Sequence, residues 1–276
     1  LHCDYCQNWF TSQAMRDPAS ERAGQLVRET SAAQLISLAQ QTDSKIIAST
    51  YNEPLITSEW AVEIFREAQK AGLKTAMISN GHATPEALDY LAPHLDGYKI
   101  DLKSMQDKNY RQLGGVLQNV LDSITLAHKL GLWVEVVTLV VPGFNDSNAE
   151  LWEAARFLAG ISPNIPWHVT AYHRDYKMVE NENTSVETLI RAADIGREAG
   201  LNHVYAGNAH GLAGEYESTH CSVCSKSPVT RRGFSIQEYK LTSEGACPHC
   251  GTTVAGVWTN NPKDVSLNGL GMPRLI

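Results

Sequence analysis

The six cysteines of this chain form three pairs, and two residues separate the cysteines within each pair. The pairs are Cys3 and Cys6, Cys221 and Cys224, and Cys247 and Cys250. Thiolates at this spacing bind a metal ion or an iron–sulfur cluster, whereas a disulfide framework is typical of small secreted chains. In a chain of 276 residues we favour metal binding, which implies the reducing environment of the cytoplasm.

The two C-terminal pairs predict one tetrahedral four-thiolate site of the zinc-ribbon or rubredoxin type. Between Cys224 and Cys247 lies the basic and aromatic sequence RRGF at residues 231–234. Zinc is the first choice because the site is closed, and a single iron with the same ligands is the alternative. Helix and strand signals stop at Gly211, so we expect residues 213–276 to form a separate module. In such a module a metal replaces the core that so few residues cannot build.

Six apolar, β-branched runs alternate with stretches of helical period in the rest of the chain. The predicted strands cover residues 45–50, 74–79, 97–102, 133–140, 166–171 and 203–206. Helix ends are predicted at Gly72, Gly131 and Gly200, and helix starts at the capping-box sequences SNAE (147–150) and TSVE (184–187). Repeated βα units predict an α/β fold over residues 1–212, with a parallel sheet that closes or nearly closes into a barrel. A doubly wound sheet is the alternative, but no glycine-rich phosphate turn follows the first strand.

Polar and charged side chains follow the carboxyl ends of these strands. They include Asn52, Glu53, Ser79, Asn80, Asp101, Lys103, Asn145, Asp146, His173 and Asn208. In a parallel barrel these ends open on one mouth, so the sequence predicts an active site there. Turn formation explains Asn80 about equally well, whereas charged groups such as Glu53, Asp101, Lys103 and His173 need partners or a ligand.

Several stretches resemble a known family. Cys3-Asp4-Tyr5-Cys6 fits the end of C-x-x-x-C-x-aromatic-C, the signature of radical S-adenosylmethionine (SAM) enzymes, whose first cysteine falls two positions before Leu1. The other stretches are CQNWFTSQ (6–13), TYNEP (50–54), DLK (101–103), VPGFNDS (141–147) and WHVTAYHRDYKM (167–178). Together they resemble the AmmeMemoRadiSam radical SAM family, which is related to pyruvate formate-lyase activating enzymes. The resemblance implies a partial (β/α)6 TIM-like barrel that lacks its first strand here, with residues 203–206 as an additional strand.

The resemblance also implies site residues. Cys3 and Cys6 match two of three thiolates that bind a [4Fe–4S] cluster, whose fourth iron takes the amine and carboxylate of SAM. Tyr5 matches an aromatic residue that packs near the adenine of SAM. Asn52 and Glu53 occupy the place of a Gly-Gly-Glu motif, whose carboxylate accepts a hydrogen bond from the methionyl amine of SAM. The two glycines of that motif are absent from this chain.

Five further residues match positions that contact SAM. Ser79 and Asn80 match polar residues that reach the ribose or carboxylate of SAM. Asp101 and Lys103 match an Asp-x-Lys pair, in which the lysine forms a charge-assisted bond with the methionyl carboxylate. His173 matches a histidine that meets SAM, whereas we expect the mid-strand His168 to belong to the core.

The reaction implied by this resemblance is reductive cleavage of SAM, which gives a 5'-deoxyadenosyl radical that abstracts hydrogen from an unknown substrate. No side chain is assigned as a general acid or base. One alternative is an activase that places a glycyl radical on a protein partner, and another is a non-catalytic metal-binding assembly protein. The implied partners are Memo-like and AMMECR-domain proteins and a reducing electron donor. Residues 1–276 alone are expected to be inactive, because the first cluster cysteine and the first strand are missing.

Composition excludes other partners. The formal net charge of −7 argues against nucleic acid and anionic lipid as partners. No apolar run reaches the roughly 18 residues that a membrane span needs. The hydrophobic content of 43% is that of a chain with a sizeable core.

Overall fold

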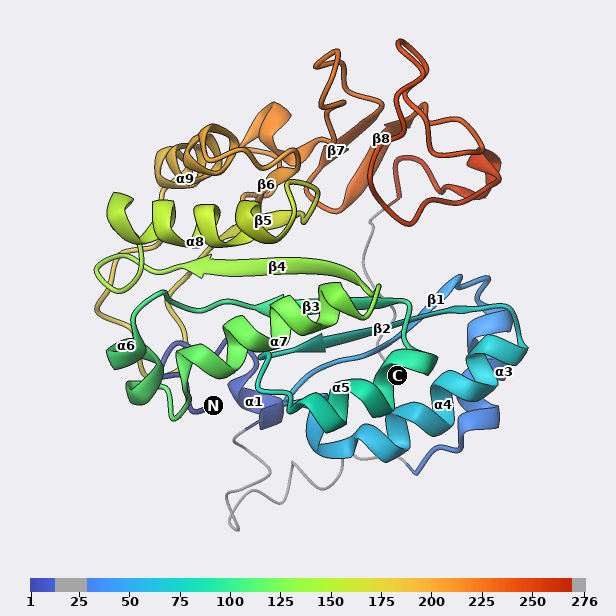
Figure 1. Ribbon diagram of the computed structural model, residues 1–276, viewed down its shortest axis with the longest axis horizontal. Coiled ribbons are helices and arrows are strands. Elements are labelled where there is room, and N and C mark those ends of the chain that lie inside the picture. The colour runs from blue at the N-terminus through green and yellow to red at the C-terminus, as the bar shows by residue number, and fades with distance from the viewer. Residues whose placement is uncertain (13–28, 270–276) are drawn as a thin grey trace. The chain divides into compact units, whose positions relative to one another are not determined.

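The computed structural model describes residues 1–12 and 29–269 (Figure 1). Gln13 of the stretch CQNWFTSQ, and residues 270–276 of the predicted C-terminal module, lie outside the described residues. The chain divides into two compact units: Leu1–Leu102, Gln106–Glu135 and Arg174–Asn181 make the first, and Lys103–Met105, Val136–His173 and Glu182–Ile276 make the second. Among the helices that the structure describes, none is both long enough and apolar enough to cross a membrane.

The first unit contains three parallel strands with helices beside them. They are β1 (Ile46–Ser49), β2 (Lys74–Ser79) and β3 (Gly97–Asp101), and β2 lies between the other two. The main helices are α3 (Ala32–Gln41), α4 (Ser58–Lys70), α5 (Pro85–Leu91), α6 (Asp107–Gln112) and α7 (Leu117–Lys129), and the short ones are α1 (Trp9–Ser12), η2 (Pro54–Thr57) and η3 (Ala92–His94). Figure 1 shows α3, α4 and α5 along one side of β1 and β2. Every second residue of β2 and β3 is buried, which is the pattern of strands with one face in a core.

The second unit contains a second set of three parallel strands. They are β4 (Trp133–Val140), whose first three residues belong to the first unit, β5 (Trp167–Ala171) and β6 (Val204–Gly207). β5 pairs with both β4 and β6. The helices are α8 (Asn148–Ile161) and α9 (Val186–Glu198), followed by η4 (Gly214–Glu217), the antiparallel hairpin of β7 (Val229–Arg232) and β8 (Ser235–Tyr239), and η5 (Pro262–Asp264). Trp167, fully buried, donates from its indole nitrogen to the Thr138 hydroxyl at 3.0 Å and thereby ties β5 to β4.

The predicted strands are confirmed. Each of the six begins and ends within one residue of its predicted limits, and β6 pairs with β5. The predicted helix ends are also confirmed, because Gly72, Gly131 and Gly200 have φ angles of 74°, 81° and 102° one residue after their helix caps. Glycine adopts this left-handed conformation without steric cost. Closure of the strands into a barrel and a boundary between residues 212 and 213 stay predictions.

Two local predictions are wrong. In TSVE the helix cap is Ser185, which accepts the Thr188 amide, and not Thr184. The Thr184 hydroxyl instead accepts the Tyr172 amide at 3.0 Å and donates to the Val140 carbonyl at 2.5 Å, so tertiary contacts already occupy it. The strand signals that stop at Gly211 miss the hairpin β7–β8, whose residues are largely charged or polar.

Candidate functional site

The carboxylate of Glu53 collects hydrogen bonds at the carboxyl ends of β1 and β2. Its Oε1 accepts the Leu55 amide at 3.1 Å and the Ser79 hydroxyl at 2.8 Å, and its Oε2 accepts the Asn80 amide at 2.7 Å. Parallel pairing of Ser49 with Met77 brings the residues after both strands to the same end. The structure therefore brings together three of the predicted residues. A carboxylate can accept about four hydrogen bonds, so Oε2 can accept one more donor.

The turn before Glu53 has an uncommon backbone. Tyr51 and Asn52 have φ angles of 64° and 54°, in the left-handed region that costs a residue with a side chain roughly 1–2 kcal/mol. Asparagine tolerates this region better than tyrosine. Both side chains are exposed. The turn thus holds two successive residues in the conformation that glycine adopts most easily, although neither residue is glycine.

Tyr98 of β3 sits behind Ser79 and fixes the direction of its hydroxyl. The buried Tyr98 hydroxyl donates to Ser79 Oγ at 3.2 Å, and the Gly81 amide donates to the same oxygen at 3.0 Å. Ser79 therefore uses its own proton to donate to Glu53. Burial raises the pKa of Tyr98 to about 12, and the nearby negative charges of Glu53 and Asp101 add to that effect. Sequence reasoning missed this role, because Tyr98 stands in an apolar alternating strand.

His82 orients the side chain of Asn80. The Val116 amide donates to Nε2 of His82 at 3.0 Å, so Nε2 carries no proton. The neutral ring then carries its proton on Nδ1 and donates it to Asn80 Oδ1 at 3.1 Å, which also accepts the His82 amide at 3.1 Å. These bonds leave the Asn80 amino group to donate elsewhere. Sequence reasoning did not assign His82, and the only signal was its position two residues after Asn80.

The remaining residues predicted at strand ends belong to both units. Asp101 forms an ion pair of 2.6 Å with Lys99, which lies two residues earlier on the same face of β3. Lys103 and His173 belong to the second unit. There the Lys103 carbonyl accepts Asn145 Nδ2 at 2.8 Å, and His173 is exposed. The half-buried His168 stacks on Tyr205 with ring centroids 5.0 Å apart.

Cys3 and Cys6 lie in a tight turn of the first unit. The Cys6 amide donates to the Cys3 carbonyl at 3.1 Å, and the Trp9 amide donates to the Cys6 carbonyl at 3.3 Å. Both cysteines are half-buried, whereas Tyr5 between them is only 4% exposed. Two thiols that share one turn, with partial access to solvent, fit the ligand chemistry of an iron–sulfur cluster.

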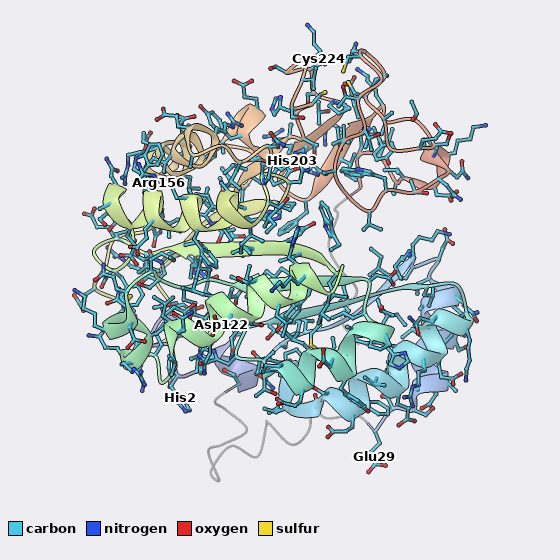
Figure 2. All side chains as sticks on the ribbon, in the orientation of Figure 1. His2, Glu29, Asp122, Arg156, His203 and Cys224 are labelled. Carbon is cyan, nitrogen blue, oxygen red and sulfur yellow. The ribbon has the colours of Figure 1, made fainter. Side chains whose placement is uncertain are left out.

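The other four cysteines meet in the second unit. Their sulfur atoms all lie within 4.8 Å of one another, with Cys221 and Cys250 3.5 Å apart and Cys224 and Cys247 3.6 Å apart. Bonds of about 2.3 Å to a tetrahedral zinc ion place sulfurs about 3.8 Å apart, so the four side chains fit a single metal ion. Figure 2 shows Cys224 at the end of this module, with sulfur atoms gathered beside it.

Two matching loops build this four-cysteine site. In each loop the first cysteine donates its amide to the carbonyl five residues later, at Lys226 and at Thr252, and its own carbonyl accepts the amide four residues later. These later residues, Ser225 and Gly251, both have left-handed φ angles, of 58° and 74°. The apolar cluster under the site contains only Cys221, Val229, Leu241, Cys247 and Val254 as buried members among the described residues. A core this small supports the view that a metal ion holds the module together.

The thiols of this site have different proton affinities. The hydroxyl and the amide of Thr252 lower the pKa of Cys250 to about 6. The Lys226 amide lowers the pKa of Cys224, but burial and the three neighbouring cysteines outweigh it and raise that pKa to about 12. Of these two thiols, Cys250 forms the thiolate that binds a metal ion more readily than Cys224 does.

Comparisons with known proteins identify the family of this chain. The model of the Radical SAM superfamily matches residues 1–158. An uncharacterized protein of Methanocaldococcus jannaschii is 32% identical over 256 residues, which cover 92% of this chain and 74% of that protein. The isethionate sulfite-lyase activating enzyme of Desulfovibrio desulfuricans is 28% identical over 125 residues, which cover 44% of this chain and 40% of that enzyme. This chain thus spans less than half of that enzyme's length.

Solved structures show the same fold. A domain of a pyruvate formate-lyase-activating enzyme from Bacteroides vulgatus superposes with a TM-score of 0.53 at 21% identity, covering 59% of this chain and 98% of that domain. Streptococcus suis SuiB bound to S-adenosylmethionine gives a TM-score of 0.55 at 14% identity, covering 67% and 45%. The superfamily match spans more than half of the chain and includes Cys3, Cys6, Glu53, Ser79 and Asn80. The chain therefore belongs to the Radical SAM superfamily and is a radical SAM enzyme related to the pyruvate formate-lyase activating enzymes.

Proposed function

We propose that Glu53 receives the methionyl ammonium of SAM and that Cys3 and Cys6 ligate the [4Fe–4S] cluster. The observation that carries this proposal is the fixed carboxylate of Glu53, which three donors hold in place while Oε2 keeps capacity for a fourth. An acceptor that is already oriented loses little freedom when the ligand binds. When bound, the cluster and SAM supply the one-electron chemistry, and the protein supplies orientation and electrostatics.

The other residues complete the proposed site. Asn80, with its Oδ1 held by His82, directs its amino group to an acceptor on the ribose or the carboxylate of SAM. Lys103 is proposed to pair with the methionyl carboxylate, and His173 and Asp101 to line the same mouth of a partial (β/α)6 barrel. Tyr5 is proposed to pack near the adenine and Asn52 to contact SAM beside Glu53. Zinc is proposed at the four-cysteine site, with a structural role.

The relatives favour a protein as the partner of the reaction. The curated relatives include activating enzymes for isethionate sulfite-lyase, for 4-hydroxyphenylacetate decarboxylase and for pyruvate formate-lyase. A glycyl-radical activase is therefore the second candidate beside hydrogen abstraction from an unknown substrate. The resemblance to the AmmeMemoRadiSam family supports Memo-like and AMMECR-domain proteins as partners, a reducing electron donor and a cytoplasmic location.

The test uses the full-length protein, produced anaerobically. Iron and sulfide content are measured first, then SAM affinity, and then 5'-deoxyadenosine formed with dithionite. Glu53→Ala is expected to weaken SAM binding at least about tenfold, because a charge-assisted hydrogen bond is lost. Glu59→Gln, an exposed change on α4, is the matched control. Absence of iron, or wild-type SAM affinity in Glu53→Ala, contradicts the proposal.

A further inference from the structure

A segment from far along the chain lies against the turn that carries Cys3 and Cys6. The segment is Arg174–Asn181, which belongs to the first unit together with residues 1–12. We propose that this segment, called the clamp below, sets the position of the cysteine turn, and that Asp175 and Tyr176 are its positioning residues. The inference rests on the proposed function only where it names the turn as the ligand of a cluster.

The backbone of the clamp binds a residue between the two cysteines. The amides of Lys177 and Met178 both donate to the Asp4 carbonyl, each at 3.1 Å. The clamp is itself closed, because the Met178 amide also donates to the Asp175 carbonyl at 3.1 Å and Arg174 Nε donates to the Asn181 carbonyl at 2.7 Å. A closed loop holds its two amides in one direction, so Asp4 is held at a defined position.

Side chains of the clamp hold the other end of the turn. Asp175 Oδ1 accepts the indole N–H of Trp9 at 2.9 Å and the Tyr176 amide at 2.7 Å. The Tyr176 ring stacks on Trp9 with centroids 5.7 Å apart and planes 16° from parallel. Lys177 Nζ lies 5.1 Å from the centre of the Tyr176 ring and 3.9 Å from the Asp4 carboxylate. The clamp thus contacts residues on both sides of Cys6.

The backbone conformation of Tyr176 supports a functional role for the contacts of the clamp. Its φ angle of 53° lies in the left-handed region, which costs a residue with a side chain roughly 1–2 kcal/mol. Such a conformation persists only where surrounding contacts over-determine it, and it clusters at functional sites. Here the surrounding contacts are those to Asp175 and Trp9, and what they orient is the turn with the two thiols.

Positioning of this turn matters for the chemistry assigned to it. The reduction potential of an iron–sulfur cluster depends on hydrogen bonds and solvent exposure around its sulfur ligands. Within the turn, short-range backbone bonds run from the amides of Cys6 and Trp9. The clamp adds bonds from residues more than 160 positions away, so it can control where the turn as a whole is placed.

The first arm of the test uses the full-length protein before any cluster is inserted, and measures amide hydrogen exchange. Asp175→Ala removes the acceptor for Trp9, and Tyr176→Gly removes the ring while glycine adopts the left-handed backbone without strain. We expect each to speed exchange at the amides of Cys6, Lys177 and Met178 about tenfold, because Asp175→Ala loses a charge-assisted bond and Tyr176→Gly loses the stacking on Trp9. Asp175→Asn keeps an oxygen acceptor and is expected to restore most of the protection. Tyr90→Ala, an exposed tyrosine on α5, is the control. Exchange in Asp175→Ala and Tyr176→Gly equal to that in the control overturns the clamp.

The second arm uses the protein with its cluster and has a readout that a merely structural role leaves unchanged. Asp175→Ala and Tyr176→Gly are expected to bind as much iron as the wild type. Both variants are expected to shift the midpoint potential and the electron paramagnetic resonance signal of the reduced cluster. They are also expected to release iron to a chelator about tenfold faster than the wild type. An unchanged potential and signal in both variants refute the positioning role. If wild-type protein takes up no cluster, the proposed function fails, and the exchange arm still decides whether the clamp exists.

Discussion

Replacing Glu53 by glutamine tests the hydrogen-bond network at the carboxyl ends of β1 and β2. Glutamine has the shape of glutamate, but its amino group cannot accept a hydrogen bond. The carbonyl oxygen of the substituted side chain can keep the bonds from Leu55 and Ser79, since both reach the same oxygen in the wild type. The amino group of that side chain then faces the Asn80 amide, which donates to Glu53 at 2.7 Å in the wild type. The amino group and the Asn80 amide are both hydrogen-bond donors, so the Asn80 amide loses its acceptor.

The expected cost follows from that lost bond. A donor left unsatisfied costs about 1–3 kcal/mol. For a chain of this size each kcal/mol corresponds to roughly 2–4 °C in the unfolding midpoint, so about 2 kcal/mol lowers the midpoint by roughly 4–8 °C. Glu53→Ala is expected to cost about as much and no more, because the half-buried site admits water that can solvate the donors.

The assay is thermal unfolding by circular dichroism, combined with hydrogen exchange at the Asn80 amide. Glu59→Gln is the matched control, because Glu59 is exposed in the first turn of α4 and its change costs at most about 1 kcal/mol. Glu53→Gln protein that unfolds at the same temperature as the control, with wild-type protection at Asn80, refutes the three-donor arrangement of this carboxylate.

Two further predictions concern Tyr98 and the four-cysteine site. Tyr98→Phe is expected to cost about 1 kcal/mol for the lost bond to Ser79. Because the folded-state pKa of Tyr98 is about 12 and that of an unfolded tyrosine about 10, its contribution to stability is intact below pH 10 and is lost as pH rises from about 10 to 12. Denaturant unfolding across this range should show that loss in the wild type and not in the variant. Cys247→Ser is expected to reduce the metal bound at the four-cysteine site below one ion per chain. It is also expected to speed amide hydrogen exchange in β7 and β8 at least about 100-fold, while the amides of β2 stay protected. Metal analysis and hydrogen exchange measure both effects, and a protected hairpin without metal contradicts the structural role.

Prediction from the sequence succeeded where the signal is local. The strands β1 to β6 are short runs rich in apolar and β-branched residues, and such runs can be recognised without knowledge of the strands beside them. The hairpin β7–β8 was missed because VTRR and SIQEY carry little apolar alternation. We propose that a metal ion bound by the neighbouring cysteines holds this segment in place, and hydrophobic periodicity does not report that constraint.

Within the site, residue types were predictable and partners were not. The position of Glu53 after β1, of Ser79 as the last residue of β2 and of Asn80 after β2 follows from the strand ends. That Ser79 and Asn80 donate to Glu53 follows from the parallel register of β1 and β2. The sequence left Tyr98 and His82 unassigned, because a buried hydroxyl in an apolar strand and a histidine in a turn have no distinctive spacing.

The sequence by itself determined the parallel α/β architecture, the helix ends at glycine and the cluster of four C-terminal cysteines. Each of these depends on residues close together in the chain, through strand periodicity, left-handed glycine or the C-x-x-C spacing. Tertiary structure alone decided that Ser79 and Asn80 donate to Glu53, that the Val116 amide donates to His82, and that the distant carboxylate of Asp175 accepts the indole N–H of Trp9. The bond from Trp9 to Asp175 joins residues 166 positions apart. Such bonds require angstrom-scale placement of both partners, which arises only when the folded chain brings distant segments together.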